Sequence, residues 1–342
     1  MDYKGVEICC PGCGGELQWS DNSRERMDCV SCHAGYPVIC DIPDLRIFAD
    51  PYIGIDDDRE KGRGLAEAAA TRKLPELIDH YYASTSVVTR QQAALYKRGL
   101  LAAGGRAVAA LDMWDKSAGL GPPGRLLEVG CGTAPLMIAA QRRGYEVVGV
   151  DIAFRWLVVG QQRLREAGLD LPLICACAEA LPFPDGQYDR IVLDSVIEHV
   201  RDQDRVLAQC SRVAVPDAAL YLATPNRFSI GPDPHTGFPA GSLYPAAVTA
   251  ALVRRQGGIP PRRRLLSVFA LRRKLADAGF GRTRVFLPDV PAAQRAGLNV
   301  LLRMAIVVYH VLKRLPGTRH LLYLAGPLLY SISLRQAASR QR

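Results

Sequence analysis

The stretch RLLEVGCGTAPLMIAAQRRGYEVVGVD, residues 125–151, contains an apolar run, a glycine turn, a helix-like segment and a second apolar run. Further short apolar runs follow at 173–176, 191–194 and 220–223, separated by helix-like stretches or longer connections. Short strands that alternate with helices predict a doubly wound α/β sheet, in which ligands bind at the carboxyl ends of the strands. The sequence GPPG at 121–124 marks the boundary before this sheet.

The glycine turn matches neither of two common phosphate-binding loops. Pro135 occupies the place of the third glycine of a dinucleotide fingerprint, and the Lys-Ser/Thr pair of a P-loop is missing. Two carboxylates flank the turn: Glu128 precedes Gly130 and Gly132, and Asp151 ends the second apolar run. Asp151 can accept hydrogen bonds from both hydroxyls of a ribose, and Glu128 favours a nearby cation. The turn therefore indicates a nucleoside that carries positive charge rather than phosphate.

These residues resemble the class I S-adenosylmethionine (SAM)-dependent methyltransferases, a family with a Rossmann-like sheet. The resemblance covers 125–288. Its motifs are LLEVGCGTA, VVGVD, AEALPFPDGQYDRIVLDSVIEHV, LYLATPN and LRRKLADAGF with RTRVFLP. It implies SAM as cofactor and assigns seven residues to its binding: Glu128, Gly130, Gly132, Asp151, Ala178, Glu179 and Asp194. The family usually has an aspartate for the adenine amine where this chain has Cys177, so Glu179 or a backbone carbonyl is expected to replace it.

Two histidines are candidate bases for removing the proton of an acceptor hydroxyl. His199 follows the predicted fourth strand, and His235 lies in a Gly/Pro-rich loop after the fifth. His199 could instead pack on SAM or cap a helix, and His235 could be structural. Tyr81 and Tyr82 are weaker candidates on the acceptor side.

A second motif lies near the start of the chain. Two C-x-x-C pairs, fifteen residues apart, predict a tetrahedral zinc site; a redox pair is the alternative. His33 is a candidate substitute ligand, and Cys9 and Cys40 are left over. The predicted ligands are Cys10, Cys13, Cys29 and Cys32. This segment resembles short zinc domains found beside or fused to methyltransferases.

Charge is distributed unevenly along the 342 residues. The net charge is +9, but residues 1–240 carry −7 and residues 241–342 carry +16. A basic C-terminal part indicates an anionic partner, either phospholipid or nucleic acid. Without a signal-peptide pattern after residue 1, we expect a cytoplasmic protein.

The C-terminal part also contains two apolar segments, 298–312 and 321–334, separated by KRLPGTRH. Each is shorter than the roughly twenty residues that a membrane-spanning helix needs, so we expect buried or interfacial helices. The flanking basic residues would suit anionic headgroups, which predicts peripheral contact with the inner face of the membrane. They are Lys313, Arg314, Arg319 and Arg335. Packing on the core or a homodimer interface is the alternative.

We therefore predict four regions: a zinc-binding mini-domain at 1–50, a helical linker or cap at 51–122, a methyltransferase domain at 123–288, and a basic, apolar helical extension at 289–342. The first functional hypothesis is O-methylation of a small-molecule, glycan or lipid-linked acceptor. The second is an rRNA or tRNA methyltransferase with a zinc finger. Nucleic acid is the less favoured partner, because aromatic residues are not interleaved with the arginines. The third is a non-catalytic binding protein with the same fold.

Overall fold

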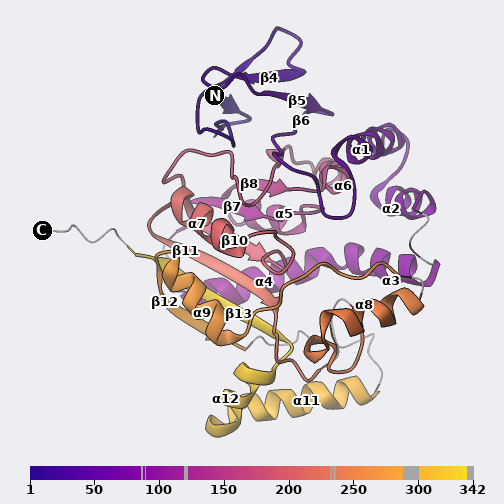
Figure 1. Ribbon diagram of the computed structural model, residues 1–342, viewed down its shortest axis with the longest axis vertical. Helices are drawn as coiled ribbons and strands as arrows, with labels where there is room; N and C mark the ends of the chain where they lie inside the picture. The colour runs from indigo at the N-terminus through magenta and orange to yellow at the C-terminus, as the bar shows by residue number, and fades with distance from the viewer. Residues whose placement is uncertain are drawn as a thin grey trace, which may run out of the picture.

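The computed structural model describes residues 1–85, 88, 90–118, 122–231, 233, 236–256, 258–287 and 300–336. Its centre is a seven-stranded sheet (Figure 1). In spatial order the strands are β12 (Phe280–Phe286), β13 (Leu328–Arg335), β11 (Ala214–Pro225), β10 (Tyr188–Asp194), β7 (Arg125–Val129), β8 (Glu146–Asp151) and β9 (Leu173–Cys175). β7 to β11 pair in parallel, whereas β13 is antiparallel to both its neighbours. The predicted Rossmann-like sheet is confirmed.

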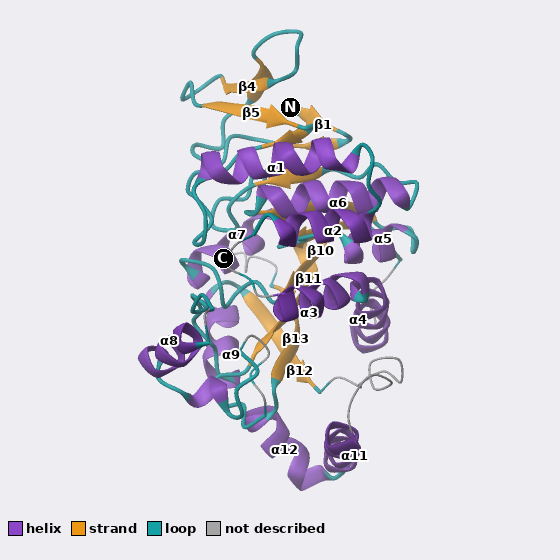
Figure 2. Cartoon of the chain, turned by 90° about the vertical axis from the view of Figure 1, so that its right-hand side faces the viewer, coloured by secondary structure: helices purple, strands orange, loops and turns teal. Residues whose placement is uncertain are grey.

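Helices cover both faces of the sheet because successive side chains of its strands point to opposite sides. Leu127 packs with α7 (Gln203–Val213) and α9 (Val268–Asp277), whereas Leu126 packs with the helices of the other face. That other face is covered by α4 (Ala103–Ala118), α5 (Pro135–Gln141) and α6 (Phe154–Glu166), with α1 (Ile55–Ala69) and α2 (Leu74–Ala83) packed outside α6. Figure 2 shows α1 and α2 beside α6. α3 (Arg90–Leu101) precedes α4.

The N-terminal residues form small antiparallel sheets at one end of the molecule (Figure 2). Their strands are β1 (Asp2–Tyr3), β2 (Val6–Glu7), β3 (Leu17–Trp19), β4 (Arg26–Cys29), β5 (Gly35–Ile39) and β6 (Ile42–Pro43). This part joins the main sheet directly, because the Leu45 N–H donates to the Cys175 carbonyl at 2.7 Å beside the edge strand β9. Apolar side chains of both parts share one core cluster.

The remaining described elements lie in the C-terminal third: η1 (Gly241–Leu243), α8 (Ala246–Arg255), α11 (Val300–Arg314) and α12 (Pro316–Ala325). The described part of the first apolar segment, residues 300–312, is helical as expected and belongs to α11. The second is helical only as far as Ala325, and its later part forms β13, so the expectation of a helix there is wrong. The later part of the segment, residues 328–334, lies in β13 between two other strands of the sheet. Its lack of charge fits this place, because both faces of an interior strand are largely covered. Periodicity does not distinguish such a strand from a buried helix.

A buried ionic network joins the segment after β6 to α1 and α6. The Asp58 carboxylate accepts hydrogen bonds from Arg46 Nη1 at 2.7 Å and from Arg155 Nη1 at 2.8 Å. It also accepts one from the Phe154 N–H at 2.8 Å. Arg46 pairs further with Asp44 at 2.7 Å, and the side chains of Arg46, Asp44 and Asp58 are fully buried. Each charge has an opposite partner, so the loss of any one of them would leave a buried charge uncompensated.

Replacing Asp58 with alanine should lower the free energy of unfolding by roughly 3–5 kcal/mol, because it leaves buried arginine charge uncompensated. Urea titration followed by circular dichroism measures this change. Asp56→Ala is the matched control on the same helix: the Asp56 side chain is 94% exposed, and its loss should cost less than about 1 kcal/mol. Equal effects of the two substitutions would contradict a stabilising role for the network.

Candidate functional site

The glycine turn after β7 holds the backbone close to its neighbours. Gly130 donates its N–H to the Val150 carbonyl at 2.7 Å and has a φ of +80°. A Cβ atom there would lie 2.1 Å from Cγ2 of Val196, so a side chain at this position would force the turn apart. The glycine is therefore required both by the turn and by the close approach of the loop after β10.

Asp151, at the end of β8, is held by two backbone amides. Its Oδ2 accepts from the Gly132 N–H and its Oδ1 from the Ala153 N–H, each at 2.8 Å. These bonds fix the carboxylate at the carboxyl edge of the sheet. Burial raises the pKa of Asp151 above its usual value despite the two bonds, which lower it.

A cavity of about 340 Å³ opens at this edge. The ends of β7 and β8 line one side of it, with Gly130 and Asp151 among the lining residues. Ala178, Glu179 and His199 line it as well, so the structure brings five of the predicted site residues together. Their roles toward SAM stay predictions.

The other predicted SAM residues lie around the cavity rather than in its lining. Gly132 contributes its N–H to Asp151, and Asp194 ends β10 and accepts from the Ser195 hydroxyl at 3.1 Å. Glu128 is buried beneath the turn, and its Oε2 has no hydrogen-bond partner within the described part of the chain. Burial raises the pKa of Glu128 well above its usual value, and the nearby carboxylates of Asp194 and Asp151 raise it further. A cation at the turn would relieve this repulsion.

The Glu179 carboxylate already has backbone partners. Its Oε1 accepts from the N–H groups of Arg201 at 2.7 Å and Asp202 at 3.3 Å. Glu179 thereby anchors the loop that leads into α7 through Oε1. Cys177 is buried, and its thiol donates to the Phe48 carbonyl at 3.6 Å. Glu179 and the backbone carbonyls of this wall both stay candidates to replace the missing aspartate.

The sequence analysis missed one wall of the cavity, formed by the segment after β6. Phe48, Asp50 and Tyr52 line the cavity from this segment. The Arg201 guanidinium lies 4.0 Å from the centre of the Phe48 ring and donates to the Ala49 carbonyl at 2.9 Å, so the wall is tied to the loop after β10. The only sign of this wall in the sequence was the group of acidic and basic residues between 44 and 59. Their pairing could not be predicted, because it depends on contacts with α6.

His199 reaches the cavity from the loop after β10. Its Nδ1 lies 3.3 Å from the Arg262 carbonyl, which can only accept, so Nδ1 carries the proton and Nε2 is the basic nitrogen. Nε2 lies 3.8 Å from Oε1 of Glu198. Oε2 of Glu198 accepts from the Thr224 hydroxyl at 2.9 Å, which orients this buried carboxyl group. His235, the other predicted base, lies outside the described residues.

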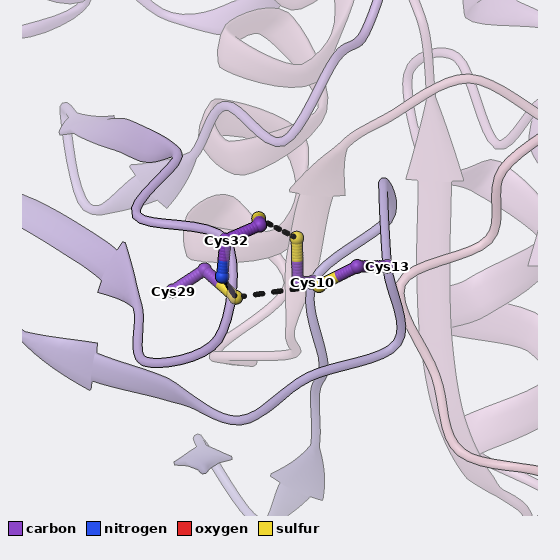
Figure 3. A group of neighbouring side chains, drawn as sticks. All are labelled: Cys10, Cys13, Cys29 and Cys32. Carbon is purple, nitrogen blue, oxygen red and sulfur yellow. Dashed lines mark hydrogen bonds between the residues drawn. The ribbon is translucent and has the colours of Figure 1, made fainter.

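The four predicted zinc ligands form a compact group at the N-terminal end (Figure 3). The sulfur atoms all lie within 4.8 Å of one another; those of Cys10 and Cys32 are 3.7 Å apart, and those of Cys13 and Cys29 are 3.5 Å apart. Zinc–sulfur bonds of about 2.3 Å in a tetrahedron put sulfur atoms roughly 3.8 Å apart, so the geometry fits zinc. His33 and the leftover Cys9 and Cys40 are not part of the group.

Residues 127–222 match the family model described as methyltransferase domain. This part of the chain is a methyltransferase domain. The ubiquinone biosynthesis O-methyltransferase of Hahella chejuensis is 36% identical to it over 118 residues, which cover 34% of this chain and 49% of that protein. The demethylmenaquinone methyltransferase of Thermus thermophilus is 33% identical over 102 residues, or 29% of this chain and 46% of that protein. The chain thus spans about half the length of the curated relatives it matches.

Among solved structures, a SAM-dependent methyltransferase of Thermotoga maritima, described as a possible histamine N-methyltransferase, is 16% identical, with a TM-score of 0.45. The match covers 72% of this chain and 97% of that one. The strand order and the antiparallel β13 described above are read from the strand pairings of this chain alone.

We expect Asp151→Asn to weaken SAM binding by roughly 10- to 100-fold, because hydrogen bonds to a charged acceptor contribute about 1.5–3 kcal/mol. Isothermal titration calorimetry with SAM measures the change. Asp170→Asn, at a carboxylate whose side chain is 80% exposed, is the control and should bind SAM as the wild type does. An unchanged affinity in Asp151→Asn would remove this residue from the cofactor site.

Elemental analysis of the purified protein should find about one zinc ion per chain. Cys29→Ser should lose the metal and expose the N-terminal strands to protease, because a sheet of this size lacks a sufficient core of its own. Cys40→Ser, outside the group, should keep both metal and protease resistance. A metal-free wild type of equal stability would rule out a structural zinc site.

Proposed function

We propose that the chain is a SAM-dependent methyltransferase that methylates a hydroxyl group of a small-molecule acceptor. The observation that carries this proposal is the cavity at the carboxyl edge of the sheet, which has the doubly held Asp151 on one side and His199 on the other. The domain match and the name of the Hahella relative, an O-methyltransferase, support the same chemistry.

The residues around the cavity fit a cationic nucleoside. Asp151 would bind the ribose hydroxyls, and the buried Glu128, with an unpartnered oxygen, favours positive charge at the turn. When bound, SAM supplies an electrophilic methyl group on a sulfonium. The wall that contains Phe48 and Tyr52 lines the cavity from the segment after β6. Orientation and exclusion of water account for much of the catalysis in such an in-line transfer.

His199 would act as the base. Nε2 would take the hydroxyl proton as the acceptor oxygen forms its bond to the methyl carbon, while the carbon–sulfur bond breaks and its electron pair stays on sulfur. The Nδ1 bond to the Arg262 carbonyl would leave the basic lone pair of the neutral ring on Nε2. The Glu198 carboxyl group, 3.8 Å from Nε2, would favour the protonated ring that results.

The direct test supplies methyl-labelled SAM to the protein together with a cell extract separated into lipid, RNA and polar fractions. Label in the lipid or polar fraction supports the proposal and yields a product whose methylated atom mass spectrometry can identify. Label confined to RNA would replace it with RNA methylation, and binding of SAM without any labelled product would indicate a non-catalytic protein.

With a labelled acceptor in hand, His199→Gln should lower kcat by roughly 10²- to 10⁴-fold, the usual contribution of a positioned base. SAM affinity should stay close to that of the wild type. His80→Gln on α2 is the matched control and should leave kcat unchanged. If His199→Gln turns over normally, His199 is not the base.

A further inference from the structure

α11 and α12 form a helical hairpin at the end of the molecule opposite the N-terminal sheets (Figures 1 and 2). The two helices pack on each other, and neither contains a buried residue. Helices of a globular domain normally bury one apolar face against the core. The hairpin therefore presents a surface that the described part of the chain leaves uncovered.

That surface is aliphatic. Leu301 is 77% exposed and Met304 is 61% exposed, and Leu321 on α12 is 63% exposed. On α11 the exposed apolar residues recur at three- and four-residue spacing, so they form one stripe along the helix: Val300, Leu301, Met304, Val307, Val308 and Val311. Contiguous apolar patches of this kind mark interaction sites.

The charge around the stripe has one sign. Residues 300–336 contain no aspartate or glutamate. Arg303 lies near the start of α11, Arg314 ends it, and Arg319 lies on α12. An aliphatic stripe with basic residues at its ends complements a bilayer interface with anionic headgroups. In a symmetric dimer through this hairpin, the same basic residues of two copies would face each other without acidic partners. For RNA, the exposed side chains of the stripe lack the aromatic rings on which bases stack.

The hairpin is attached at the edge of the sheet that contains the cavity. Asn226 directly follows β11, and its Nδ2 donates to the carbonyls of Leu324 at 2.8 Å and Gly326 at 3.0 Å. Ile230, 70% exposed, donates its N–H to the Ala325 carbonyl at 3.3 Å and extends the apolar surface beyond α12. Because β11 is parallel to β8 and β10, its end lies on the same edge as Asp151 and His199.

We propose that the α11–α12 hairpin binds the surface of an anionic phospholipid bilayer, with its aliphatic stripe among the acyl chains and its arginines at the headgroups. The contact is peripheral: among the described residues, no helix has the length and hydropathy that a membrane crossing requires. Such a contact would present the cavity edge of the sheet to acceptors that reside in the membrane.

Sedimentation with vesicles tests this surface without any methyl acceptor, so its result is independent of the proposed activity. The full chain should sediment with vesicles of phosphatidylcholine and phosphatidylglycerol and much less with phosphatidylcholine alone, and added salt should weaken the binding. Leu301→Glu/Val307→Glu should lower the partition coefficient about tenfold or more. Arg314→Gln/Arg319→Gln should lower it roughly tenfold for anionic vesicles only.

Matched controls carry the same changes on helices away from the hairpin. Leu95→Glu/Val108→Glu, at positions of α3 and α4 that are 57% and 45% exposed, and Arg98→Gln/Lys116→Gln, on the same two helices, should bind vesicles as the wild type does. Circular dichroism and SAM titration should show all variants folded. The proposal is overturned if the wild type ignores anionic vesicles, or if both hairpin variants bind unchanged. It is also overturned if sedimentation equilibrium shows a dimer that Leu301→Glu/Val307→Glu dissociates.

Discussion

The arrangement of the site depends on the hydrogen bonds and ion pairs of the buried Asp58 carboxylate. This carboxylate joins Arg46 of the N-terminal segment to Arg155 of α6, and it also accepts a hydrogen bond from the N–H of Phe154, the first residue of that helix. α6 begins three residues after Asp151, so the same contact positions the end of β8 and the wall of the cavity formed by residues 48–52. Without it, the small N-terminal sheets would be attached to the domain mainly by apolar packing and a few backbone bonds.

The order of the strands explains why the cavity lies at the carboxyl edge of the sheet. From β7 the chain continues to β8 on one side, and later returns to β10 on the other side. Such a reversal opens a crevice at the carboxyl ends of the strands, where doubly wound sheets bind ligands. Asp151 follows the strand on one side of the reversal, and His199 follows the strand on the other. The proposed ribose-binding carboxylate and the proposed base therefore line a common cavity although 48 residues separate them in the chain.

The two ends of the molecule differ in composition as well as in position. The end with the N-terminal sheets carries the cysteine group, and the opposite end carries the aliphatic, basic hairpin. The proposed methyl transfer takes place between them, at the sheet edge to which Asn226 fastens the hairpin. Part of the positive charge of residues 241–342 therefore lies at the end opposite the N-terminal sheets (Figure 2), since α11 and α12 carry basic and no acidic residues.

Local features could be predicted from the sequence because neighbouring residues determine them. Parallel buried strands are nearly continuous apolar runs, which located β7 to β11, and paired C-x-x-C motifs identified the cysteine group. Features that depend on distant contacts could not be predicted. Leu328–Arg335 became a strand because β11 and β12 offered backbone partners on both sides, and Phe48 and Tyr52 reached the cavity because a buried network bound their segment to α6. The sequence was sufficient for β7 to β11 and for the chemistry of the glycine turn, because neighbouring residues set both. The distant side chains that surround the turn required the tertiary structure, since their contacts join residues far apart in the chain.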